Sequence, residues 1–166
     1  MKRVLIIVLA SYLAYALEFL LYNFWGPWGK PELMVLVVVF FNLYLGIRFG
    51  IIAAVFCGLF KDTGSVAPFG TYILVYLSVS YLATFVRRYL YQPGSRFSRA
   101  LVSFFVVIGS FIIQAILTSM SHEINIKDLL VDVLVPQLVT TVIAATYVFE
   151  KLKNISVFLA LKKQSS

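Results

Sequence analysis

Three acidic residues lie within or beside long apolar stretches, where an ionisable side chain is costly and is a candidate functional group. They are Glu18, Asp62 and Asp132, each expected near the outer end of a helix that spans a membrane. At this common depth they could line an outward-facing polar pocket, or two could share a proton as paired carboxylates. The structural alternative for Asp62 and Asp132 is an acid at a helix end that contacts water or caps a neighbouring backbone. For Glu18 it is a hydrogen bond to another helix.

Residue types that typically form metal sites or catalytic centres are scarce. His122 is the only histidine and Cys57 the only cysteine, whereas a metal site needs several convergent His, Cys or carboxylate ligands. We expect His122 to be a solvated loop residue and Cys57 a buried, inert thiol. The sequence contains no Gly-x-Ser-x-Gly, no phosphate-binding glycine loop and no His-Glu-x-x-His motif. We therefore predict no catalytic residue, no metal and no cofactor, and a protein that is not an enzyme.

The composition indicates that lipid surrounds most of the chain. Of its 166 residues, 61% are hydrophobic and 13% are charged, while soluble domains have about 25% charged residues. The formal net charge is +7, but the basic residues lie between apolar runs and form no continuous stripe. This pattern argues against nucleic-acid binding. We predict that residues 1–166 form a single all-α domain, a polytopic membrane protein.

Six apolar stretches are long enough, or nearly long enough, to cross a bilayer as helices. The predicted spans are residues 4–22, 31–45, 49–60, 69–86, 101–120 and 129–149. The positive-inside rule favours six spans, because a cytoplasmic amino terminus then places most basic residues in the cytoplasm. Five spans would put Arg48 in mid-bilayer, at a cost of roughly 3 kcal/mol or more. Both termini are therefore predicted to be cytoplasmic, and residues 151–163 form either an interfacial helix or a frayed end of the sixth span.

Four small residues recur at intervals of four, namely Gly46, Gly50, Ala54 and Gly58. On an α-helix this spacing places them on one side, where another helix can approach closely. We predict a packing seam whose neighbour is either another helix of this chain or a partner protein. Gly46 and Gly50 also bracket Arg48 as turn residues between the second and third spans. Leucine at Gly50 or Gly58 is predicted to disrupt folding or complex assembly.

Four arginines occupy the connection between the fourth and fifth predicted spans. They are Arg87, Arg88, Arg96 and Arg99, with aromatic residues between them. Such a stretch could stack on RNA, but beside a membrane its expected partner is anionic lipid headgroups, at about 1 kcal/mol per basic residue. A cytoplasmic protein is the alternative partner. We predict that this loop contacts lipid or protein at the inner surface.

The middle of the chain carries the residues of a known family pattern. Pro31 begins the second predicted helix, a glycine-rich third helix ends in Gly58-x-x-x-Asp62, and Gly70 follows eight residues after the acid. Pro136 is similar to a proline often found in the last helix of the same family. In these features the sequence resembles the rod shape-determining membrane proteins called MreD.

This resemblance implies a fold and a set of partners. The implied fold has six helices, both termini in the cytoplasm, and is similar to the substrate-binding subunits of energy-coupling-factor vitamin transporters. The implied function is that of a multi-pass scaffold of the elongasome in the bacterial inner membrane. Such a scaffold binds MreC and helps couple MreB filaments to the RodA polymerase and its class B transpeptidase.

A vitamin-binding transporter subunit is the alternative from a different functional class. Ala10-x-x-x-Ala14 in the first predicted helix is similar to the small-residue motif with which such subunits dock, although the motif is common. A transporter subunit should hold a small molecule in its outer half, near Glu18, Asp62 and Asp132.

Overall fold

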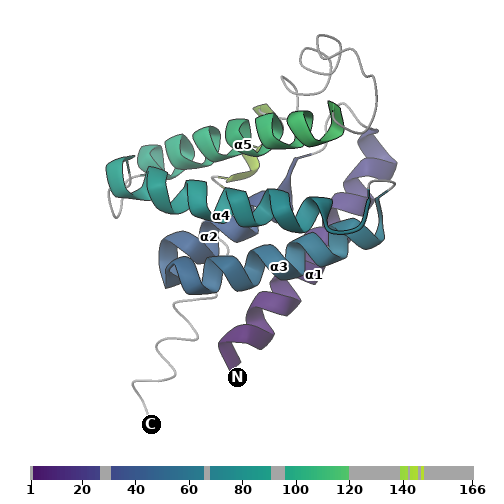
Figure 1. The fold of residues 1–166 in the computed structure, drawn as a ribbon, viewed down its shortest axis with the longest axis horizontal. Coiled ribbons are helices and arrows are strands. Elements are labelled where there is room, and N and C mark those ends of the chain that lie inside the picture. The colour runs from purple at the N-terminus through teal and green to yellow at the C-terminus, as the bar shows by residue number, and fades with distance from the viewer. Residues whose placement is uncertain are drawn as a thin grey trace.

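Five helices make up most of the computed structural model, which describes residues 2–26, 31–65, 68–90, 96–119, 139–141, 143–145 and 147 (Figure 1). They are α1 (Lys2–Trp25), α2 (Leu33–Leu45), α3 (Ile47–Thr63), α4 (Thr71–Leu90) and α5 (Arg96–Ser119). Residues 139–141, 143–145 and 147 are also helical. Within these ranges there is no strand, so the prediction of an all-α fold is confirmed.

The predicted spans compare with these helices as follows. The first five lie largely within α1 to α5, in order, while most of the segment 129–149 and all of 151–163 lie outside the described residues. By length and apolar composition, one described helix is able to cross a membrane by itself, Arg3–Phe24 within α1. Two shorter apolar helices are Leu33–Leu45 and Phe104–Ile113. The six-span topology therefore stays a prediction.

Helix α2 is the central helix of the bundle. It contacts α1, α3, α4 and α5, and all its residues from Leu33 to Leu43 are buried. A helix that is apolar on every side is stable when other helices surround it. The helices α3, α4 and α5 lie side by side, and α1 packs against α2 and α3 (Figure 1). The core therefore forms around α2, with Val75, Tyr76 and Val79 of α4 among its buried residues.

The helices α2 and α3 are separated by one residue, Gly46. Its φ of 93° lies in the left-handed region that glycine adopts without steric cost. Its N–H donates to the carbonyl of Asn42 (3.1 Å) and its carbonyl accepts from the N–H of Gly50 (3.1 Å). Because one left-handed residue is enough to end α2 and begin α3, Gly50 lies inside α3. Its predicted role as a turn residue was wrong.

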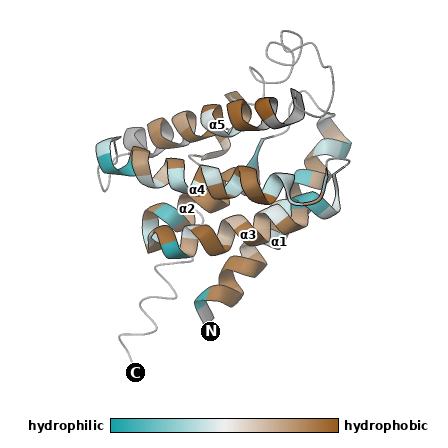
Figure 2. Cartoon of the chain, in the orientation of Figure 1, coloured by the Kyte–Doolittle hydropathy of each residue, from teal (hydrophilic) through white to brown (hydrophobic). Residues whose placement is uncertain are grey.

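Helix α1 exposes large apolar side chains along most of its length. The exposed fraction is 70% for Leu5, 52% for Leu13 and 58% for Phe19. Apolar residues predominate along the helices, and hydrophilic residues gather at several helix ends (Figure 2). An exterior of this kind is typical of a surface that meets lipid or a partner rather than water.

Candidate functional site

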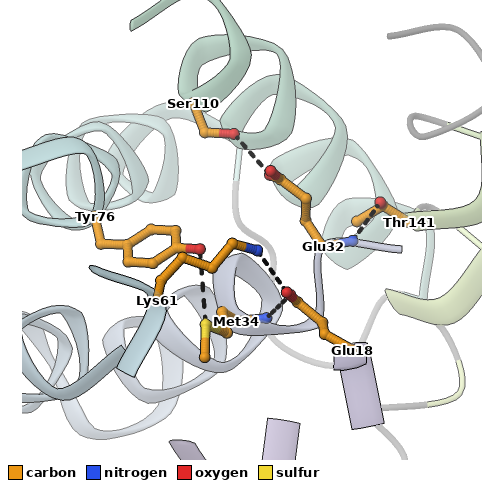
Figure 3. Close-up of polar contacts among 7 residues, drawn as sticks. All are labelled: Glu18, Glu32, Met34, Lys61, Tyr76, Ser110 and Thr141. Carbon is orange, nitrogen blue, oxygen red and sulfur yellow. Dashed lines mark hydrogen bonds and ion pairs between the residues drawn. The ribbon is translucent and has the colours of Figure 1, made fainter. Parts of the chain in front are cut away.

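A cluster of polar and charged side chains surrounds the beginning of α2 (Figure 3). We call it the α2-start cluster, and it consists of Glu18, Glu32, Lys61, Ser110 and Thr141. These residues come from α1, the residue before α2, α3, α5 and the segment 139–141. The two glutamates are only 2% and 7% exposed. Segments that lie far apart in the sequence therefore meet at one buried point.

Glu18 connects α1 with both α2 and α3. Its Oε2 lies 2.6 Å from the Nζ of Lys61, and its Oε1 accepts the backbone N–H of Met34 at 3.0 Å. The first N–H groups of a helix have no partner within that helix. The carboxylate of Glu18 therefore caps α2 from outside, where the helix dipole contributes about half a positive charge.

Glu32 connects the start of α2 with α5 and with the segment 139–141. Its backbone N–H donates to the Oγ1 of Thr141 at 3.0 Å. The Oγ of Ser110 lies 3.3 Å from its Oε2 and 2.8 Å from the carbonyl oxygen of Val107, so the single hydroxyl hydrogen can be donated to either. Pro31 precedes the helix by two residues and Glu32 occupies the N-cap position. The helix thus begins later than predicted, because a tight turn from the carbonyl of Pro31 to the N–H of Leu33 (3.0 Å) leads into it.

Among the groups that the structure describes, the charges of the α2-start cluster nearly balance. Two carboxylates contribute two negative charges, Lys61 contributes one positive charge, and the N-terminus of α2 contributes about +0.5. Burial of an unpaired charge would cost several kcal/mol. In the part of the chain that the structure describes, no buried side-chain nitrogen or oxygen lacks a hydrogen-bond partner. The cluster is therefore built to hold helices together.

Asp62 caps a different helix. Its Oδ2 accepts the N–H groups of Gly70 (3.0 Å) and Ile73 (3.4 Å), and its Oδ1 accepts that of Tyr72 (3.0 Å). Gly70 precedes α4 with a φ of 99° and has no side chain with which to cap the helix. Asp62 supplies that missing acceptor from the end of α3. The spacing of eight residues from Asp62 to Gly70 thus places the carboxylate at the end of α3 within hydrogen-bond distance of the start of α4.

The predicted outer pocket is not formed by the two acids that the structure describes. Glu18 is directed at the start of α2 and Asp62 at the start of α4, because buried backbone N–H groups attract a carboxylate whereas a second carboxylate repels it. Asp132 lies outside the described residues, as do Pro136 and His122. No group of three or more His, Cys, Asp or Glu side chains that could hold a metal occurs among the residues described.

Asp62→Ala is expected to lower the free energy of unfolding by about 1–2 kcal/mol, because three N–H groups at the start of α4 lose their acceptor. Asp62→Asn keeps one acceptor oxygen and should lose less. Thermal unfolding in detergent, followed by circular dichroism, measures both. Thr63→Ala is the matched control, since this exposed hydroxyl bonds to the carbonyl of Phe60 within its own helix. Equal melting temperatures for Asp62→Ala and Thr63→Ala would contradict the capping role.

The small residues of α3 pack against helices of this chain. A Cβ at Gly58 would lie 2.5 Å from the Cα of Ile73, in α4, and a Cβ at Gly50 would lie 2.8 Å from the Cβ of Asn42, in α2. Ala54 is fully buried between them along the helix. Gly46 does not belong to this seam: it lies at the break before α3, and nothing lies within 4 Å of a Cβ placed there.

A second polar group lies near the other end of α2. The Nδ2 of Asn42 lies within 3.1 Å of three oxygens of Ser80 and Thr84 in α4. The Nη1 of Arg87 donates to the carbonyl of Asn42 at 3.0 Å. A cation near the last carbonyls of a helix is favoured by the helix dipole. Arg87 was predicted to contact lipid or protein, but it is half-buried and bonds to the end of α2. The carbonyl of Asn42, which also accepts the N–H of Gly46, lies within its reach.

The other predicted arginines divide into two groups. Arg88 is exposed. Arg96 and Arg99 begin α5, and their side chains lie outside what the structure describes.

Sequence reasoning missed the pairing of Lys61 with Glu18 and the cap that Arg87 provides. One signal in the sequence could have led to the caps that Glu18 and Asp62 provide. Neither α2 nor α4 begins with a Ser, Thr, Asp or Asn cap, the residue types preferred there. Buried helices without local caps need acceptors from elsewhere, and Glu18 and Asp62 are the acids at suitable depth.

Comparisons with known proteins agree with the pattern of residues 31–70. No curated protein and no solved structure matches the chain. A family model described as rod shape-determining protein MreD matches residues 1–153, nearly the whole chain. This family consists of membrane proteins with a role in determining rod shape. The chain therefore belongs to the MreD family of rod shape-determining proteins.

Proposed function

We propose that the protein is a non-enzymatic scaffold of the elongasome that spans the bacterial inner membrane with six helices and has both termini in the cytoplasm. It binds MreC and helps couple MreB filaments to the RodA polymerase and its class B transpeptidase. The family match over residues 1–153 supports the part of this proposal that concerns cell shape. None of the comparisons supports the alternative of a vitamin-binding transporter subunit.

The observation that carries the scaffold proposal is how the buried acids are used. Glu18 and Asp62 each accept backbone N–H groups of another helix, and Glu18 is also paired with Lys61. These acids connect helices and are not gathered in an open site. Such connections fix the helices relative to one another, and a fixed arrangement gives a partner a defined surface to recognise.

The apolar exterior supports the membrane part of the proposal. Exposed leucine and aromatic side chains on α1, together with Leu74 and Tyr81 on α4 and Ile112 and Ile116 on α5, cover the outside of the bundle. Lipid or the helices of partner proteins would cover these side chains. In this arrangement the buried polar groups connect helices, and the surfaces that partner helices recognise are apolar.

Affinity purification of the full chain in a mild detergent tests this proposal. MreC is expected to co-purify with the tagged chain and to remain bound during size-exclusion chromatography. The control is an unrelated multi-pass protein that carries the same tag and is expressed to the same level. A folded, monodisperse chain that elutes without MreC would overturn the proposed scaffold role.

A further inference from the structure

Basic side chains from three helices gather at one end of the bundle. Arg3 of α1 lies with its Cζ 5.8 Å from the centre of the Phe49 ring at the start of α3. Arg48 is the neighbour of Phe49, and the end of α4, with Arg88, is held close to the end of α2 by the bond from Arg87 to Asn42. Hydrophilic residues mark the same segments, at the beginning of α1, at the junction of α2 and α3 and at the end of α4 (Figure 2).

Among the described residues, the charged side chains at this end are of one sign. Arg3, Arg48 and Arg88 are exposed. The three acidic residues that the structure describes lie elsewhere: Glu18 in the last third of α1, Glu32 just before α2 and Asp62 in the last turn of α3. Phe85 and Tyr89 flank Arg88 on α4, are 63% and 73% exposed, and have ring centroids 5.1 Å apart. Exposed aromatic residues beside arginines are typical of the boundary between lipid tails and headgroups.

We propose that Arg3, Arg48 and Arg88 form one surface that binds the phosphates of anionic lipid headgroups, and that Arg87 does not belong to it. Arg87 is occupied by the carbonyl of Asn42 and holds α4 against α2. The inference rests on the proposed membrane orientation, in which this end faces the inner leaflet. This surface is assembled from three separate helices, and it shares Arg88 with the loop that was predicted to contact lipid or protein.

Purified full-length chain in detergent tests the proposal through its melting temperature in mixed micelles that contain phosphatidylglycerol or phosphatidylcholine. Binding to the folded state raises that temperature according to the ratio of lipid concentration to Kd. Phosphatidylglycerol is expected to stabilise the wild-type chain more than phosphatidylcholine does. The difference should decrease in 1 M salt, where charges are screened within about 3 Å.

Removal of each arginine should reduce the affinity for phosphatidylglycerol by a similar factor, so that the factors multiply. Each Arg→Gln change is expected to reduce the apparent affinity for phosphatidylglycerol about fivefold, and the combination of Arg3→Gln, Arg48→Gln and Arg88→Gln on the order of 100-fold. Arg88→Lys keeps the charge and should retain most of the response. Arg87→Gln should lower the melting temperature equally in both lipids and leave the difference between them unchanged.

Three outcomes would overturn the inference: a triple variant that keeps the full response, an equal response to both lipids in the wild type, or a response lost through Arg87→Gln alone. If the triple variant does not fold, the test is the response of Arg88→Gln to phosphatidylglycerol compared with that of Arg88→Lys. Equal responses of these two variants would overturn the inference. Arginine-dependent capture of a cytoplasmic protein without a response to phosphatidylglycerol would also overturn it. The assay contains no MreC, so its failure is distinct from a failure of the scaffold proposal.

Discussion

Lys61→Met is expected to lower the free energy of unfolding by about 3–5 kcal/mol, the largest effect predicted for any single residue of this chain. The substitution removes the cation that lies 2.6 Å from the buried carboxylate of Glu18. Methionine matches the length and apolar stem of lysine, so the loss of packing is small. Titration of the chain in mixed micelles with sodium dodecyl sulfate measures the change.

A double-mutant cycle separates the charge effect from other causes. Glu18→Gln with Lys61→Met removes both charges, while the glutamine oxygen can still accept the N–H of Met34. The double variant should therefore be more stable than Lys61→Met alone. Thr63→Ala, at an exposed position in the same helix, is the control and should change stability by less than about 0.5 kcal/mol. A double variant less stable than Lys61→Met would refute the proposed charge balance.

The second large effect is expected at Gly58, where alanine should destabilise the chain by about 3 kcal/mol. The added Cβ would lie 2.5 Å from the Cα of Ile73, and a backbone atom can move away only if the whole of α4 shifts. Gly50→Ala should cost less, because its nearest neighbours are side-chain atoms of Asn42 and Ser80. The same unfolding titration measures both variants.

Gly109→Ala provides a matched control within another helix. The three atoms nearest to a Cβ there all belong to the side chain of Leu82, whose end can rotate aside. Alanine also favours a helix over glycine by about 1 kcal/mol, so Gly109→Ala should be neutral or slightly stabilising. Equal losses at Gly58 and Gly109 would show that helix propensity, and not close approach to α4, sets the effect.

The helices could be predicted from the sequence because their signals are local. Apolar runs separated by Gly46 and by the stretch from Gly64 to Gly70 already indicate separate helices, and the structure confirms an all-α fold. The close approach of another helix at Gly50 and Gly58 follows from their spacing on α3. That the neighbours at these positions belong to α2 and α4 of the same chain could not be predicted, because spacing gives a face and not its partner.

The roles of the acids required the folded chain. The sequence placed Glu18 and Asp62 at similar depth in the membrane. Depth alone does not distinguish a pocket shared by the two carboxylates from two separate helix caps. The choice depends on which backbone N–H groups lie within about 3 Å of each carboxylate. For Glu18 the neighbours are Met34, 16 residues away, and Lys61, 43 residues away.

By itself, the sequence of this protein determined that the chain is helical, apolar and a member of the MreD family, since these properties depend on composition, runs and spacing. The tertiary structure alone decided that α2 is the central helix, that Glu18 and Asp62 cap helices other than their own, and that Arg87 is bonded internally while Arg88 is exposed. The physical reason is that a buried charge takes the partner that packing brings within hydrogen-bond distance, and packing joins residues that the chain holds far apart.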